Sequence, residues 1–227
     1  MNGYYHCDMS KDIANIKLAW RKGPGYPRII VGIIKRTASA VSFSYIPEGL
    51  TEAKQYGFIP YTDFPDEKRT YTEGVLDIFG FRLNKAERGD IQKYYDYWEI
   101  DPEYKDDKYY LLAHTQGLLP TDNFEFLADF YPVKDLSFNS ELCGLSKLLL
   151  PTDTLNEGDE LRWEKDPDCP YDKYAVKVFK GDTFIGYIKK VHYRIFYRKC
   201  RSTLKVSVKS LNRNGHINRA FIKISFE

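Results

Sequence analysis

The chain has 227 residues, of which 43% are hydrophobic and 29% are charged, so it is long enough to bury the core of one large domain or two small ones. Aromatic residues make up 16% of the sequence, and its 19 Tyr and 14 Phe suit both interaction surfaces and β-rich cores. The sequence has no collagen-like or low-complexity repeats, and its composition argues against a disordered chain. No apolar run approaches the roughly 18 residues of a membrane-spanning helix.

Two strands are predicted near the start of the chain. Residues 29–34 form an apolar run that indicates a buried strand. Residues 41–45 alternate between apolar and polar side chains, which indicates the hairpin partner of that strand. We expect Pro47 to end the second strand.

Helices are predicted next. Apolar side chains within residues 71–83 favour one helix. The sequence Asn-Lys-Ala-Glu at residues 84–87 is typical of a capping box that opens a second helix, which would run through Trp98. The apolar segments 111–112 and 124–126 are compatible with either helix or strand.

The remainder of the chain reads as β-rich. Residues 161–163, 175–179 and 184–188 are strand candidates, and Lys-Gly-Asp at 180–182 supplies a tight turn between the last two. Residues 191–199 suit a short helix that places Arg194 and Arg198 four residues apart on one face.

Two further strands have apolar residues on one face and basic residues on the other. They span residues 204–209 and 220–226, with a strong hairpin turn at 212–215 between them. We therefore predict an α+β protein, with a mixed α/β domain over residues 1–135 and a small β-barrel domain with a short helix and one electropositive side over residues 136–227.

Charge divides the chain at the same place, near residues 131–138. Residues 1–135 carry 17 Lys and Arg against 21 Asp and Glu, whereas residues 136–227 carry 17 against 11. Residues 183–226 hold eleven basic residues, no acidic ones, and several interleaved aromatics. Such a strip attracts phosphate backbones, and aromatics beside it can stack on unpaired bases. It could equally be a solvated face, or dock on an acidic partner that includes the protein's own N-terminal half.

Metal and cofactor sites are not expected. The four Cys are widely separated and form no Cys-x-x-Cys pair, and only His6 among the four His is adjacent to a Cys, Cys7. The first residues also lack the basic segment and apolar segment of a secretory signal. We expect reduced thiols in a cytoplasmic protein that has no membrane partner.

Signals for catalysis are weak. The Gly-rich segment 22–25 lacks the spacing of a P-loop, and no Ser or Cys nucleophile can be paired with a His from spacing. Asp66-Glu67-Lys68 has the form of a metal-nuclease motif, but its polar, turn-like setting favours a solvated loop. We therefore expect no enzymatic activity, with a metal nuclease as a disfavoured alternative.

The loop at residues 166–173 has two prolines and three aspartates between two predicted strands. Its carboxylates could simply cap backbone N–H groups, or the stiffened loop could present an aromatic and a carboxylate to a ligand. Together with Gly-Asp-Glu-Leu at 158–161, Ala-Val-Lys-Val at 175–178 and Ile-Gly-Tyr-Ile-Lys-Lys at 185–190, this loop resembles the HIRAN domain over roughly residues 138–226. The resemblance implies a compact, OB-like β-barrel that binds the 3′ end of single-stranded DNA.

The resemblance also implies roles for particular residues. Tyr171 would stack on the terminal base, Asp172 would accept a hydrogen bond from the terminal 3′-hydroxyl, and Lys189 or Lys190 would contact phosphates. At the Arg-Tyr pair of the DNA-binding family member, this chain has Ser146 and Lys147, so one stacking aromatic is missing and 3′-end specificity is less firmly implied than nucleic-acid binding. The complete set of expected nucleic-acid-binding residues is Tyr171, Asp172, Lys189, Lys190, Arg194, Arg198, Lys147 and Phe221.

A second resemblance concerns the N-terminal part. Val-Gly-Ile-Ile at 31–34, Phe-Ser-Tyr-Ile-Pro-Glu-Gly-Leu at 43–50 and the apolar segment 71–83 are similar to the small N-terminal subdomain of HipA-type kinases, over about residues 28–130. That subdomain holds no catalytic residues, and the kinase core has no counterpart in this chain. The alternative function is therefore a non-catalytic, antitoxin-like partner of a separate HipA-type kinase, and the alternative structure is an unrelated α+β domain.

Overall fold

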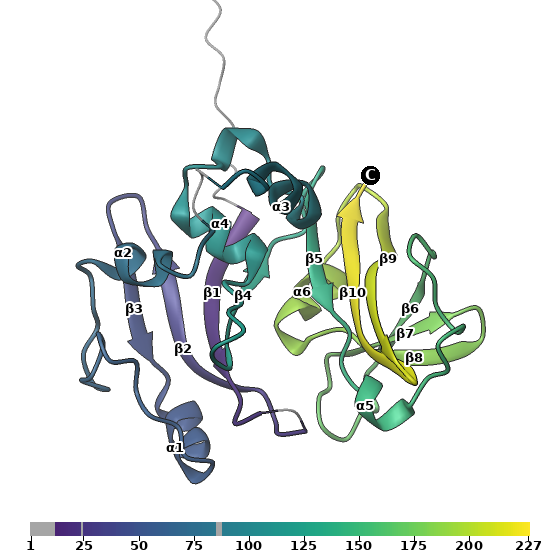
Figure 1. Ribbon diagram of the computed structural model, residues 1–227, viewed down its shortest axis with the longest axis horizontal. Coiled ribbons are helices and arrows are strands. Elements are labelled where there is room, and N and C mark those ends of the chain that lie inside the picture. Colours follow the sequence, from purple (N-terminus) through teal and green to yellow (C-terminus); the bar gives the residue numbers. More distant parts are fainter. Residues whose placement is uncertain (1–11, 24, 85–87) are drawn as a thin grey trace, which may run out of the picture.

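The computed structural model describes residues 12–23, 25–84 and 88–227. Its two halves lie side by side, an N-terminal half that ends near residue 135 and a C-terminal half that follows it (Figure 1). The former is built on a four-stranded antiparallel sheet in the order β3-β2-β1-β4. These strands span β1 Ile13–Trp20, β2 Ile29–Arg36, β3 Val41–Tyr45 and β4 Phe124–Phe130.

The predicted β2–β3 hairpin is confirmed, with Ile34 opposite Phe43 in an antiparallel register. The undecided segment 124–126 lies in β4, which pairs with β1 at the edge of the sheet. Strand β1 was not predicted, although the fully buried Ile16 and Leu18 alternate along it as in a half-buried strand.

Helices cover this sheet and connect its strands. They are α1 Pro47–Gln55, α2 Val75–Gly80, α3 Ile91–Trp98, the 3₁₀ turn η2 Pro102–Tyr104 and α4 Lys108–Thr115. Helix α1 was not predicted: Pro47 ends β3 as expected but also begins α1, since a proline is tolerated in the first turn of a helix.

The helix expected over residues 71–83 is shorter, because Gly74 in a left-handed conformation precedes α2 at Val75. The expected helix through Trp98 forms as α3, but it begins at Ile91. Of its expected capping box, residues 85–87 lie outside the described residues, as do Pro24 of the segment 22–25 and the pair His6 and Cys7.

The C-terminal half contains two three-stranded antiparallel sheets, β5-β10-β9 and β6-β7-β8. Its elements are β5 Ser137–Glu141, α5 Leu145–Leu148, β6 Arg162–Asp166, β7 Ala175–Lys180, β8 Thr183–Tyr187, η3 Lys190–His192, α6 Tyr193–Tyr197, β9 Leu204–Asn214 and β10 His216–Phe226. The predicted strands are confirmed, and Gly215 makes the β9–β10 turn in a left-handed conformation. The helix expected over residues 191–199 is shorter, because α6 follows the 3₁₀ turn η3 and ends at Tyr197.

Isolated bridges join the two sheets, at Cys143–Tyr187 and Glu160–Ser207. Gly186 lets the chains meet at the first of these, because a Cβ there would lie 2.6 Å from the carbonyl oxygen of Cys143. The C-terminal half therefore contains two antiparallel sheets joined by bridges, whereas the closed barrel stays a prediction.

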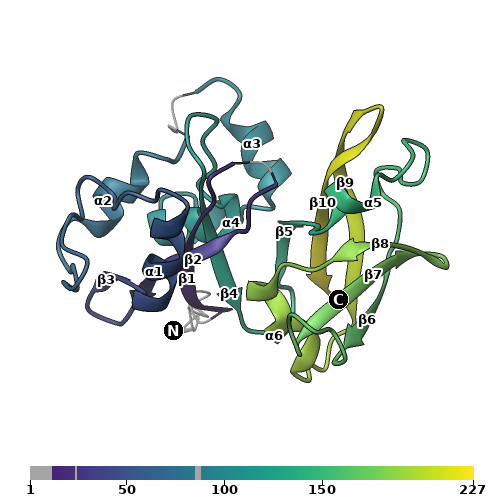
Figure 2. The same ribbon diagram turned by 90° about the horizontal axis from the view of Figure 1, so that it is seen from below.

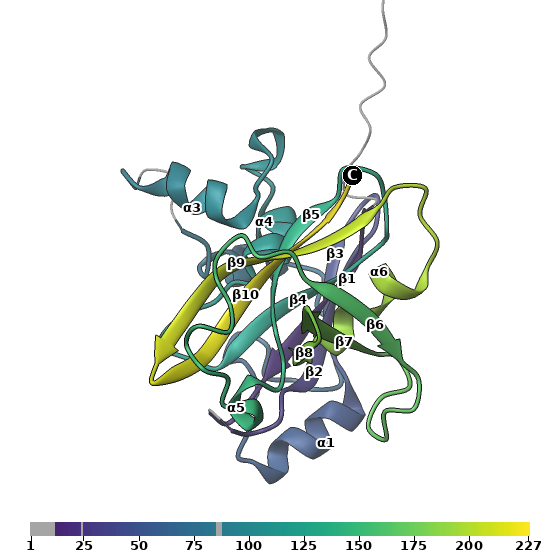
Figure 3. The same cartoon turned by 90° about the vertical axis from the view of Figure 1, so that its right-hand side faces the viewer.

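The cores of the two halves are continuous. Phe130, at the end of β4, stacks on Phe138 of β5 with ring centroids 4.3 Å apart. Strand β4 lies against the segment that contains η3 and α6, and α3 lies near β9 and β10 (Figures 2 and 3). The acidic half is therefore packed against the strip that carries the predicted basic surface.

Candidate nucleic-acid interface

Lys189, predicted to contact phosphates, is buried between the two halves. Its side chain is 2% exposed, and its ammonium lies 3.0 Å from Glu125 Oε2 and 3.6 Å from Glu141 Oε2. It also donates to Gln116 Oε1 over 3.1 Å. Lys189 and Arg28 together hold the pKa of the buried Glu125 carboxyl at about 2, against the opposing effect of burial. The assignment of Lys189 to phosphates is therefore corrected: its charge is already neutralised out of reach of solvent.

Arg194 is engaged in the same interface. Its guanidinium makes a bidentate pair with Asp129 of β4, with Nε 2.8 Å from Oδ1 and Nη2 2.7 Å from Oδ2. Both carboxylate oxygens and two of the Arg194 donors are thereby occupied. Arg194 is thus placed to hold α6 against β4 rather than to neutralise a phosphate, which corrects its predicted role.

Helix α3 covers the basic outer face of the β9–β10 hairpin. Glu99 lies between two lysines, with Lys209 Nζ 2.6 Å from Oε1 and Lys223 Nζ 2.8 Å from Oε2. Phe221 packs edge-on against Trp98, with ring centroids 5.8 Å apart. The predicted alternation of β9 and β10 is confirmed, but the electropositive side is covered here, and Phe221 is not an open stacking platform.

Four cations of the strip are exposed beside and after α6. They are Lys190, Arg198, Lys199 and Arg201. None of the four forms an ion pair with any described residue. The Arg198 guanidinium lies 5.4 Å from the centroid of Tyr131, and that of Arg194 lies 5.1 Å from the same ring. The expected placement of Arg194 and Arg198 on one face is thus confirmed.

Tyrosines gather next to these cations. Tyr174 stacks on Tyr193 of α6, with centroids 4.6 Å apart and planes inclined by 23°. Tyr197, one turn further along α6, meets Tyr174 edge-on at 5.4 Å. Sequence analysis missed Tyr174, Tyr193 and Tyr197 as site residues, although the aromatic interleaving of the basic strip was a signal for the last two. We call these three residues, Tyr171 and the four exposed cations the α6 face.

The loop at residues 166–173 is shaped by its carboxylates and leaves one aromatic ring exposed. Asp172 accepts a hydrogen bond from the Tyr174 backbone N–H over 3.0 Å, and Asp166 pairs with Lys177 at 3.0 Å. Both carboxylates thus help to shape the loop. Tyr171, in contrast, is 91% exposed and lies just before the Tyr174 stack, so the folded loop presents an aromatic ring to solvent.

Lys147 is exposed on α5, and α5 lies at the far side of the C-terminal half from α6 (Figures 2 and 3). The structure therefore does not bring Lys147 to the α6 face. Tyr171 and Asp172 lie in the loop that contacts α6 through Tyr174, whereas Lys190 precedes α6 and Arg198 follows it.

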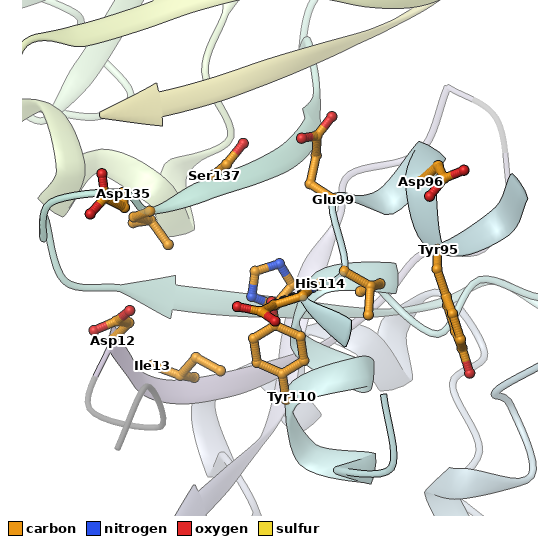
Figure 4. A pocket seen from close by; sticks show the side chains of 12 residues that line it. Asp12, Ile13, Tyr95, Asp96, Glu99, Tyr110, His114, Asp135 and Ser137 are labelled. Carbon is orange, nitrogen blue, oxygen red and sulfur yellow. Dashed lines mark hydrogen bonds between the residues drawn. The ribbon is translucent and has the colours of Figure 1, made fainter. Parts of the chain in front are cut away.

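A cleft on another part of the molecule has the opposite charge. It encloses about 400 Å³ between α3, α4 and the start of β5, and Figure 4 shows carboxylates around the buried imidazole of His114. The acidic residues lining it are Asp12, Asp96, Glu99, Asp101 and Asp135. Such a lining repels a polyanion, which leaves the α6 face as the better candidate.

The motif at residues 66–68 and the expected absence of metal sites and of membrane-spanning segments can also be compared with the structure. In the motif of residues 66–68, Glu67 pairs with Lys54 at 2.7 Å and Asp66 caps the backbone N–H of Lys68, as in an ordinary polar turn. In the part of the chain that the structure describes, no group of three or more His, Cys, Asp or Glu side chains could hold a metal ion. No helix within that part is both long and apolar enough to cross a membrane.

Comparisons with known proteins identify part of the chain. The family model described as the HIRAN domain matches residues 135–219, so this part of the chain is a HIRAN domain. HIRAN domains are known to bind DNA, which supports nucleic-acid binding by these residues. The crystal structure of the HIRAN domain of human HLTF is 23% identical, with a TM-score of 0.33, and the match covers 40% of this chain and 74% of that one.

A search of curated proteins found no match. The family match begins at residue 135, so it does not test the resemblance of residues 28–130 to HipA-type kinases. That resemblance and the associated kinase partner remain predictions.

Proposed function

We propose that this protein binds single-stranded nucleic acid through the α6 face and that it acts by binding rather than by catalysis. The observation that carries the proposal is the coincidence of four exposed cations, which have no ion pair among the described residues, with a cluster of tyrosines beside a 91% exposed Tyr171. Cations that follow a backbone, next to rings on which bases stack, are the combination that single strands require.

The cations on this face supply affinity that does not depend on sequence. Each phosphate that they neutralise releases counterions, so affinity should fall steeply as salt is raised. Arg198 and Lys199 are adjacent, exposed and free of ion pairs within the described chain, so this pair can be altered without breaking a salt bridge there.

Tyr171 and Asp172 supply preference for the end of a strand. Base–aromatic stacking contributes about 1–3 kcal/mol per base, and the exposed ring of Tyr171 is placed for it. One Asp172 oxygen accepts from the Tyr174 N–H, which leaves Oδ2 to accept a terminal hydroxyl. We therefore propose a preference for a free 3′-hydroxyl over a 3′-phosphate.

The test is fluorescence anisotropy with labelled single-stranded, blunt duplex and 3′-phosphorylated DNA. We expect the Arg198→Glu/Lys199→Glu variant to lose at least about tenfold in affinity for every single strand, since two cations become two anions. A Lys93→Glu/Lys105→Glu variant makes the same charge change at exposed positions of the N-terminal half and should bind nearly as the parent does.

The aromatic and carboxylate roles separate in the same assay. Tyr171→Ala should weaken binding of all single strands, whereas Asp172→Asn should lose only the discrimination against a 3′-phosphate. Equal affinity of the parent for both ends would remove the end-preference proposal, and unchanged affinity of the Arg198/Lys199 variant would remove the α6 face.

A further inference from the structure

A cleft lies between the outer face of the N-terminal sheet and the η3–α6 segment. It encloses about 360 Å³, within the usual range of small-ligand sites. Strands β1, β2 and β4 form one wall, and the start of η3 and α6 forms the other. The residues lining it are Lys17, Arg28, Ile30, Leu127, Asp129, Cys143, Lys189, Lys190, Val191 and Tyr193.

Positive charge dominates this lining. Arg28 and Lys189 are held by Glu125, at 2.7 and 3.0 Å, and Asp129 is held by Arg194. Lys17 and Lys190, in contrast, form no ion pair with any residue that the structure describes. The cleft therefore contains two ammonium groups whose charge is not balanced by a paired carboxylate.

Lys17 is the more unusual of the two. It projects from the middle of β1 and is partly buried, and burial lowers the pKa of its ammonium below the ordinary value. Asp129 opposes that effect, and Lys35 and Arg194 add to it. An ammonium in this environment is stabilised when an anion binds beside it. The anion replaces the hydration that burial removes and offsets the repulsion from Lys35 and Arg194.

The other walls suit an organic group rather than a bare ion. Ile30, Leu127 and Val191 supply apolar surface next to the cations. Tyr193 and Lys190 line the cleft and also belong to the α6 face, so the cleft is continuous with the proposed binding surface. A polymer with alternating anionic groups and flat apolar groups could therefore extend from the α6 face into the cleft.

We propose that this cleft takes the continuation of the bound single strand and that Lys17 contacts its phosphate. This inference rests on the proposed function and extends it, because it makes the N-terminal sheet part of the nucleic-acid site. The bound nucleic-acid strand would run from Tyr171, along α6, into the cleft between the two halves. There Lys17 and Lys190 would face its phosphate backbone.

The test compares short and long single strands in the full-length protein. We expect Lys17→Gln to reduce affinity for a long oligo-dT by about threefold to tenfold and to lower the slope of log K against log salt by about 0.7, as loss of one phosphate contact should. Affinity for a short oligo-dT that fills only the α6 face should change little. Lys17→Arg, which keeps the charge, should retain most of the affinity.

Lys35→Gln is the matched control. Lys35 is exposed on β2 of the same sheet, one strand from Lys17, and it does not line the cleft. It makes the same charge change, so a purely long-range field effect would appear equally in both variants. Urea unfolding of each variant checks that the fold is retained.

Amine labelling gives a readout that does not depend on a variant. Bound long oligo-dT should protect Lys17 from an amine-reactive reagent and leave Lys35 reactive. If the α6-face variant loses binding while Lys17→Gln matches the parent and Lys17 is not protected, this inference is overturned and the proposed function stands. If the parent binds no single strand at all, both are overturned.

Discussion

Burial of His114 and His192 lowers the pKa values of their imidazoles. The His114 imidazole is buried beside Tyr110, with ring centroids 4.1 Å apart, and its Nδ1 has no hydrogen-bond partner among the described residues. Burial lowers the pKa of His114 to about 3. His192 is also buried, and burial together with the nearby Lys189 lowers its pKa to about 3. Both imidazoles are therefore neutral in the folded protein.

Acid should destabilise the fold well before the carboxylates titrate. The unfolded state binds protons at these two histidines below pH 6.5, while the folded state resists until about pH 3. The stability that the two neutral histidines contribute is therefore fully present above pH 6.5. As the pH drops below that value, the free energy of unfolding falls by up to about 1.4 kcal/mol per pH unit for each histidine. Urea unfolding between pH 7 and pH 5 measures this slope. His114→Phe should roughly halve it, and an unchanged slope would contradict the assignment.

Lys189 should matter for stability rather than for direct contact with a ligand. Lys189→Met would leave Glu125 and Glu141 with less compensation inside the interface, and breaking one side of a buried pair typically costs about 3–5 kcal/mol. Chemical denaturation of Lys189→Met against Lys190→Met, its exposed neighbour, separates the two roles. Equal stability of both variants would show that the buried network is not formed.

At the scale of elements, the sequence predicted the strands of the C-terminal half better than the helices of the N-terminal half. Residues 204–209 of β9 and 220–226 of β10 alternate between the two faces, so Val206 and Val208 lie in the core as expected. Helix α2 was predicted too long, because apolar periodicity continued past the residues whose backbone is helical. Pro47 was read only as the end of a strand, because a proline is compatible with both a strand end and a helix start.

The covering of the basic strip could not be predicted. Lys189 is 64 residues from Glu125 in sequence, and Lys223 is 124 residues from Glu99. No local pattern couples such positions, so the charge asymmetry left docking on the acidic half as one alternative and could not identify which cations that half would neutralise. The exposed part of the candidate site depends on local turn and helix patterns, so the sequence could predict that Tyr171, Lys190 and Arg198 belong to it.

Helix α3 should be held on the β9–β10 hairpin by both packing and charge. Trp98 is 6% exposed and contacts Phe221, so Trp98→Ala should cost about 3–5 kcal/mol of unfolding free energy. Glu99→Gln should cost about 1 kcal/mol or less, because its partners are partly exposed and salt screens them. Thermal or urea unfolding at low and high salt measures both. A larger loss for Glu99→Gln than for Trp98→Ala would contradict this ranking.

At the scale of the whole molecule, the acidic half covers part of the basic half and leaves another part open. Ion pairs to Glu99, Glu125 and Asp129 occupy Lys223, Lys209, Lys189 and Arg194, whereas the α6 face remains exposed. The covered cations hold the halves together, and the exposed ones are available to a polyanion. Under the proposed function, the N-terminal half therefore covers part of the basic strip and contributes Lys17 to the cleft beside the α6 face.

The salt dependence of single-strand binding tests this division most directly. Arg198→Gln/Lys199→Gln should lower the slope of log K against log salt by about 1.4, as expected for two lost phosphate contacts. Lys209→Gln/Lys223→Gln removes the same charge from covered positions and should leave that slope unchanged. The account is contradicted if the covered pair lowers the slope and the α6-face pair does not.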